Sequence, residues 1–286
     1  MTLVRRFPIS FFLLATVAIT YVLGIAMFLA LQRIQAGFGI DLSGVNDLVM
    51  KFGPTLGGIL TIGLLAGRKG LGDLFRRCLR WRFPPLLYVG AILIQPLILL
   101  AALLSRGYGA EARSVSLGIA LGVFAGQLLL GVFLGGGLGE ELGWRGFMLP
   151  RLCERHSPLV ASLLVAIAWF AWHIPAYVLA DKGESDPVLP FAVIVIPFSI
   201  VLTWAYFRSK ESLLLPILLH GAINASFYTM EDLLPGVTGA TGFQPAFDWI
   251  VAGIWCLLAG IVVVKWGPGL GRETSTPPAA PAPDPL

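Results

Sequence analysis

The stretch Gly139-Glu-Glu-Leu-Gly-Trp-Arg-Gly-Phe-Met-Leu-Pro150 carries two adjacent carboxylates, and an arginine follows the second by four residues. It ends a long apolar run in a chain of 286 residues that is 57% hydrophobic and 13% charged. One charged side chain in the middle of a membrane helix costs about 2.5–3.5 kcal/mol on insertion-derived scales, so such residues usually mark function. We therefore take Glu140, Glu141 and Arg145 as the residues around which the chain is organised.

The composition predicts an all-α, polytopic membrane protein. Its mean hydropathy is +0.83, and its apolar runs are long and free of charge. Eight segments are long enough to cross about 30 Å of hydrocarbon: residues 9–31, 50–66, 85–104, 116–149, 158–180, 189–207, 213–230 and 247–266. We expect the fourth to end near Pro150, because proline cannot continue the helical hydrogen-bond ladder.

We expect residues 1–266 to form a single membrane domain with an uncleaved first span. Residues 267–286 are rich in proline and alanine, which predicts a disordered cytoplasmic tail. Cys78, Cys153 and Cys256 form no CxxC pair and no metal-like spacing, so we expect ordinary thiols without a disulfide role.

The basic residues predict the orientation. With both termini in the cytoplasm, 15 of the 20 lysines and arginines fall on the cytoplasmic side, as expected for an integral protein of the cytoplasmic (inner) membrane. The net charge of +4 therefore follows topology and gives no indication of nucleic-acid binding. The basic segment Gly67 to Pro85 interleaves Arg with Leu, Phe and Trp; both an amphipathic helix on anionic lipid and a topology-setting loop are open for it.

The charged stretch predicts a division of labour. Glu141 and Arg145 are four residues apart and share one helix face, so we expect them to pair. Glu140 points about 100° away and is then available for chemistry. The plainer interpretation is a charged helix cap just outside the hydrocarbon.

Two later spans place polar residues at a similar expected depth. The fifth contains Trp169-Phe-Ala-Trp-His173, and the seventh contains His220 and Asn224 on one helix face. Taken alone, His173 is equally a packing residue, and the pair His220 and Asn224 an interhelical hydrogen-bond pair.

Together these residues have the chemistry of a hydrolytic site. A carboxylate and an imidazole around one water can deprotonate it and later protonate a leaving amine. A second histidine and an asparagine are suited to a developing oxyanion. Alternatively, Glu140, His173 and His220 could hold a divalent metal such as zinc that activates the same water; the sequence leaves this open, and HExxH is absent.

The chain has three ordered motifs: EExxxR at Glu140 to Arg145, an aromatic residue four positions before His173, and HxxxN at His220 to Asn224. This pattern resembles the CAAX-protease and bacteriocin-processing family (CPBP, or abortive-infection family) of intramembrane endopeptidases. The resemblance covers about residues 116–230 and departs from FxxxH by Trp169. It implies eight helices around a cavity open to the cytoplasm. It further implies that Glu140 and His173 activate water, His220 and Asn224 stabilise the oxyanion, and Glu141 with Arg145 supports the site.

The leading hypothesis is thus an intramembrane endopeptidase, of glutamate or metallo type, that cuts a membrane-embedded or lipid-anchored peptide, prenylated or not. Signal or pheromone peptides and bacteriocin maturation or immunity are further roles that the resemblance implies. One alternative is a transporter or channel in which Glu140, Glu141 and Arg145 relay an ion or proton. Another is a non-catalytic family member acting as a scaffold or immunity partner.

Overall fold

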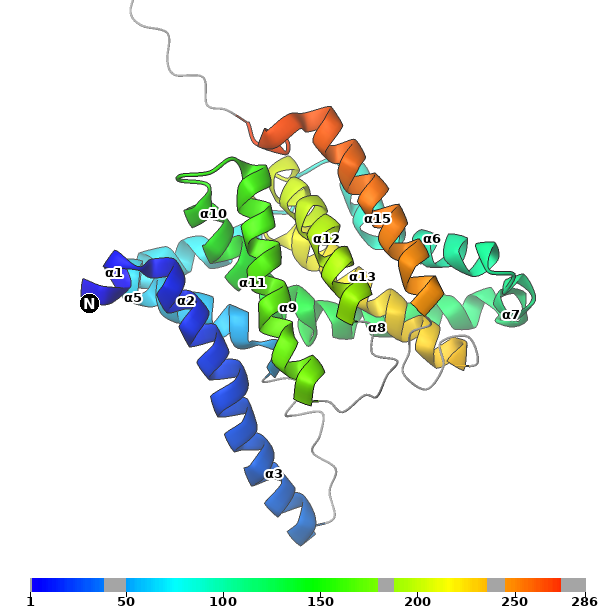
Figure 1. Ribbon diagram of the computed structural model, residues 1–286, viewed down its shortest axis with the longest axis horizontal. Coiled ribbons are helices and arrows are strands. Elements are labelled where there is room, and N and C mark those ends of the chain that lie inside the picture. The colour runs from blue at the N-terminus through cyan, green and yellow to red at the C-terminus, as the bar shows by residue number, and fades with distance from the viewer. Residues whose placement is uncertain (1, 39–49, 180–187, 236–244, 274–286) are drawn as a thin grey trace, which may run out of the picture.

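The structure, a computed structural model, describes residues 2–38, 50–179, 188–235 and 245–273. Every element in these ranges is a helix, which confirms the predicted all-α class (Figure 1). The helices pack around a short buried segment, α9 (Gly136–Gly143), which carries Glu140 and Glu141.

The first predicted span is one long rod with a π-helical section. Its parts are α2 (Pro8–Val17), the π-helix η1 (Ala18–Leu23) and α3 (Gly24–Phe38), and the short α1 (Thr2–Arg6) precedes it across a bend at Phe7. Figure 1 shows α3 projecting away from the other helices. The bundle therefore contacts this rod through α2 and η1, where Phe12, Thr16 and Thr20 are buried.

The second predicted span is the first part of α5 (Gly53–Cys78). The helix bends at Gly67, whose φ of 57° favours glycine, and continues through the basic segment to Cys78. Beyond the bend, Leu74 is fully buried while Phe75 is exposed. The basic segment was expected to be either an amphipathic helix or a loop. Up to residue 78 it is a helix with one buried and one exposed face.

The fourth predicted span is not one helix. After α6 (Pro85–Ser105) and the short α7 (Gly109–Ser114), α8 (Leu117–Phe133) stops, and two residues separate it from α9. A π-helix, η2 (Trp144–Met148), and α10 (Leu149–Leu152) complete the segment. It ends two residues past the expected end near Pro150, because this proline lies in the first turn of α10, where its missing N–H leaves no hydrogen bond unmade.

The remaining spans match the sequence-based bounds closely. They are α11 (Pro158–Leu179), α12 (Val188–Arg208), α13 (Leu214–Leu233) and α15 (Pro245–Trp266). The 3₁₀ turn η4 (Gly267–Gly269) follows, and Leu270 is fully buried. The start of the predicted tail is thus packed against the bundle, and its residues 274–286 lie outside the described part.

Within the described ranges, six helical segments are long and apolar enough to cross a membrane, which confirms a polytopic helical protein. The first part of α5 and α13 are absent from these six, so the predicted count of eight is not confirmed. Only 14 residues of α5 precede its bend, and α13 carries His220, Asn224 and Asp232. The cavity open to the cytoplasm and the cytoplasmic position of both termini stay predictions.

The three cysteines are free thiols, as expected. Burial raises the pKa of Cys78 and of Cys153 to about 11, so both are neutral at physiological pH. Cys256 is exposed on α15.

Candidate active site

The segment α9–η2 lies at the centre of the bundle because its glycines let other helices approach its backbone. A Cβ placed on Gly143 would lie 2.2 Å from the carbonyl oxygen of Pro54 on α5. Thr55 Oγ1 on the same helix donates to the carbonyl oxygen of Leu138 at 2.7 Å. This close contact fixes the helix turn that carries the two glutamates.

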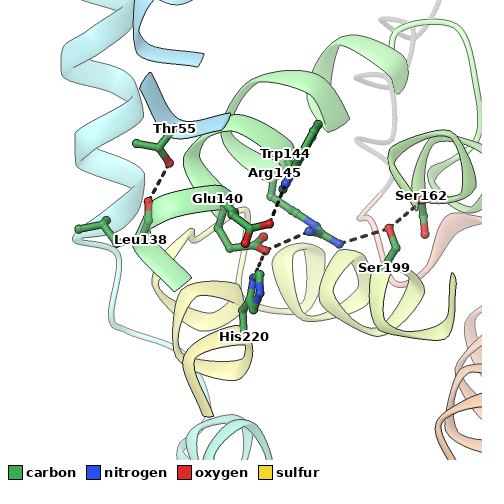
Figure 2. A network of polar contacts seen from close by, with 9 residues as sticks. Thr55, Leu138, Glu140, Trp144, Arg145, Ser162, Ser199 and His220 are labelled. Carbon is green, nitrogen blue, oxygen red and sulfur yellow. Dashed lines mark hydrogen bonds and ion pairs between the residues drawn. The ribbon is translucent and has the colours of Figure 1, made fainter. Parts of the chain in front are cut away.

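Glu141 and Arg145 form the predicted ion pair. Arg145 Nη1 donates to Glu141 Oε1 at 3.0 Å, and both side chains are fully buried. His220 from α13 donates its Nδ1–H to the same oxygen at 2.7 Å. Figure 2 shows this junction between α9, η2 and α13. The pair therefore does more than balance charge, because it also orients the His220 ring.

Arg145 extends this network to two further helices. Its Nη2 donates to Ser199 Oγ on α12 at 3.2 Å, and Ser199 Oγ donates to the carbonyl oxygen of Ser162 on α11 at 2.8 Å (Figure 2). The guanidinium carbon also lies 5.1 Å from the ring centroid of Trp169. Arg145 thus holds η2, α11 and α12 in a fixed arrangement around Glu141.

Glu140 is buried but outside the ion pair. Its Oε2 accepts a hydrogen bond of 3.2 Å from Trp144 Nε1, and the residue is 5% exposed. A Cβ placed on Gly136 would lie 2.9 Å from Glu140 Oε1 and 2.4 Å from His220 Nε2. Both atoms therefore converge on the position that a Cβ of residue 136 would occupy, here called the space beside Gly136, and only glycine allows both side chains to lie there.

The tautomer of His220 follows from its partner. A carboxylate oxygen can only accept, so Nδ1 carries the proton that is shared with Glu141. Nε2 then presents a lone pair to the space beside Gly136, and it becomes a donor when the ring takes up a second proton. The carboxylate–histidine contact fixes both the tautomer and the direction of Nε2.

His173 is attached to the same cluster through Trp169. Its Nδ1 donates to the carbonyl oxygen of Trp169 at 2.9 Å, which leaves its Nε2 free as an acceptor. The ring lies 4.6 Å from Trp172 and 4.8 Å from Phe191, measured between centroids. His173 interacts electrostatically with His220, yet within the described residues no hydrogen bond joins it to Glu140. That both groups act on one water stays a prediction.

Asn224 lies one turn beyond His220 on α13 and is partly buried. No other residue in the described ranges hydrogen-bonds to its side chain amide. His220 and Asn224 thus lie one turn apart on α13, as expected, and the hydrogen-bond partner of His220 is Glu141.

The site residues are also candidates to hold a metal ion. Among the described residues, no three His, Cys, Asp or Glu side chains are grouped to hold a metal ion. Glu140 and His220 border the space beside Gly136, and the described residues supply no third ligand of these kinds there. The zinc alternative for Glu140, His173 and His220 stays a prediction.

Several residues of this site were not found from the sequence. Trp144 lies four residues after Glu140, so helical spacing alone could have identified it. No sequence pattern identifies Ser199 as a site residue, because single serines are common in apolar spans. No pattern identifies Gly136 either. Trp169 was noted only as an aromatic position before His173.

Comparison with known proteins adds a family to this geometry. The family model "Type II CAAX prenyl endopeptidase Rce1-like" matches residues 122–226, which contain α9, η2 and most of α11 to α13. CAAX prenyl protease 2 of Methanococcus maripaludis is 33% identical over 92 residues, which is 30% of this chain. The match spans 34% of that relative's length, about one third. The resemblance predicted from the motifs is thereby confirmed, and over residues 122–226 this chain is similar to the Rce1-like CAAX prenyl endopeptidases.

Proposed function

We propose that this protein is an intramembrane endopeptidase that hydrolyses a peptide bond with water activated by Glu140. The observation that carries the proposal is the approach of Glu140 Oε1 and His220 Nε2 to each other at Gly136, within a buried part of the bundle. A carboxylate acting as general base and an imidazole near the reacting carbonyl are the groups that such a hydrolysis needs.

The reaction follows from the available atoms. Glu140 takes a proton from water, and the resulting hydroxide adds to the substrate carbonyl carbon. His220, once protonated at Nε2, and Asn224 donate to the oxyanion, while Glu141 and Arg145 hold the imidazole in place. The C–N bond then breaks, and Glu140 returns its proton to the leaving amine. His173, with its free Nε2, is proposed as the second group on the water.

We propose a membrane-embedded or lipid-anchored peptide as substrate. The family description and the relative's name refer to CAAX prenyl substrates, and the catalytic groups lie in a bundle with six apolar helices. A prenylated C-terminal peptide is therefore the first candidate, and an unlipidated membrane peptide the second.

The test is peptide cleavage by the purified full-length protein in proteoliposomes. Farnesylated and unmodified versions of one CaaX-terminated peptide would be compared by mass spectrometry, with and without a chelator. We expect a new C-terminus at one bond, produced by the wild type and lost in a Glu140→Ala, His173→Ala variant. Cleavage that persists in this variant would refute the proposal, and loss with chelator would assign the metallo type.

The ion-relay alternative is less well supported. Glu141 and Arg145 are fully buried and bonded to each other, to His220 and to Ser199, so neither is held ready to exchange ions with water. Ion flux in the same proteoliposomes that requires Glu140, without any peptide cleavage, would reverse this ranking. An absence of both activities would favour the non-catalytic scaffold.

A further inference from the structure

The indole N–H of Trp169 is a buried donor without a hydrogen-bond acceptor. Trp169 is 3% exposed, and its Nε1 has no partner among the described residues. Leaving such a donor unmatched away from water costs about 1–3 kcal/mol. The two other site tryptophans have acceptors, since Trp144 donates to Glu140 and Trp172 donates to Thr20. The free donor therefore needs an explanation.

Trp169 contacts both histidines of the candidate site and Arg145. Its ring lies 5.1 Å from the His220 ring in an edge-on arrangement and 6.2 Å from the His173 ring, measured between centroids. Arg145 lies over the same ring, and the Trp169 carbonyl oxygen accepts from His173 Nδ1. A side chain with these contacts has little freedom to turn its N–H elsewhere.

The Glu140 carboxylate is the acceptor within reach of this donor. The Trp169 indole interacts with Glu140 at a geometry short of a hydrogen bond. Trp144 already donates to Oε2, while Oε1 borders the space beside Gly136. A second donor on the carboxylate would hold the plane of the carboxyl group, so that the base faces its water in a fixed direction.

We propose that Trp169 is a positioning residue, whose indole N–H hydrogen-bonds to the Glu140 carboxylate in the working enzyme and, together with Trp144, orients it for proton abstraction. This inference rests on the proposed function. It assigns to Trp169 a donor role that a phenylalanine in the same place would not supply.

Trp169→Phe removes the N–H and keeps an aromatic ring against His220 and Arg145. We expect kcat to fall about 10- to 100-fold, with KM within about twofold, because orientation of the base acts on the chemical step. Replacement of Trp169 by benzothienylalanine, which keeps the full bicyclic shape without the N–H, should give the same fall.

Trp255→Phe is the matched control. Its Nε1 donates to Gln95 Oε1 at 2.7 Å between two buried side chains outside the site. This variant should lose stability, because an acceptor is left unpaired, and should keep the wild-type kcat. If Trp169→Phe and the benzothienylalanine protein both retain wild-type kcat, the proposal is overturned.

A second measurement separates this inference from the proposed function. The Trp169 indole ¹H–¹⁵N resonance, assigned through Trp169→Phe, should move to the position of an unbonded N–H in Glu140→Ala. An unchanged resonance overturns the positioning role, whatever the activity. If neither the wild type nor Trp255→Phe cleaves any peptide while this resonance moves, the proposed function fails and the contact between Trp169 and Glu140 stands.

Discussion

Glu140 and Glu141 are neighbours in the chain but have different surroundings. Glu141 is bonded to Arg145 and His220, whereas Glu140 accepts from Trp144 and borders the space beside Gly136. Helical spacing predicted the pair with Arg145, and the structure confirms it. The bond to His220 joins residues 79 apart in sequence, so no local pattern could predict it.

The buried pair gives a stability prediction. Arg145→Met leaves Glu141 as a buried carboxylate with His220 as its remaining partner, and we expect a loss of about 3–5 kcal/mol in the free energy of unfolding. The comparison is Arg151→Met, which breaks the largely exposed pair with Glu154 and should cost at most about 1 kcal/mol. Denaturation of both variants in the same detergent would measure this, and equal losses would contradict the role given to Arg145.

The segment α9–η2 was the element least accessible to sequence reasoning. The sequence predicted one helix from 116 to 149, although the run Gly135-Gly-Gly137 is a local signal for a turn where α8 ends. Helix α13 also approaches the chain on both sides of this break, since a Cβ on Gly131 would lie 2.5 Å from the carbonyl oxygen of Gly221, and one on Gly137 would lie 2.7 Å from that of Ile217. By contrast, α11, α12 and α15 were predictable within a few residues, because polar or proline-containing segments bound each apolar run.

The close contact of α9 with α5 can be tested by a substitution that adds one methyl group. Gly143→Ala places a Cβ 2.2 Å from the carbonyl oxygen of Pro54, so one of the two helices must shift. We expect a loss of about 1–3 kcal/mol in stability and reduced cleavage, because the turn that carries Glu140 moves. The control is Gly122→Ala on α8, where a Cβ meets nothing within 4 Å and helix propensity favours alanine. Thermal unfolding of both proteins should show a fall only for Gly143→Ala; the reverse order would be evidence against this packing.

For the molecule as a whole, hydropathy identified a helical membrane protein, and six segments of the described residues meet the length and hydropathy of a membrane span. Helix α13 is not among the six; many of its residues are buried in the bundle, and it carries His220 and Asn224. Such a helix is covered by its neighbours, so its polar groups need not face lipid. The two glutamates and His220 thus lie on helices that other helices cover, α9 and α13.

The predicted orientation can be measured by labelling with a membrane-impermeant maleimide in intact cells. Lys69 and Arg106 are exposed, and we place Lys69 on the cytoplasmic side and Arg106 outside. In a Cys256→Ala background, Arg106→Cys should label in intact cells and Lys69→Cys only after lysis. Cys78 and Cys153 should give little background, because burial raises the pKa of both thiols to about 11 and few thiolates are present at pH 7. Labelling of Lys69→Cys in intact cells would reverse the topology.

The most direct test of the central claim is the rate at which Glu140→Gln protein cleaves a membrane peptide in proteoliposomes. Glutamine keeps the size and the acceptor oxygen of residue 140 but cannot take a proton from water. We predict a rate at least about 100-fold below wild type with an unchanged unfolding temperature, while Glu141→Gln, which weakens the contacts to Arg145 and His220, lowers the unfolding temperature as well. A Glu140→Gln protein that retains more than about one tenth of the wild-type rate would contradict the assignment of Glu140 as the base that activates water.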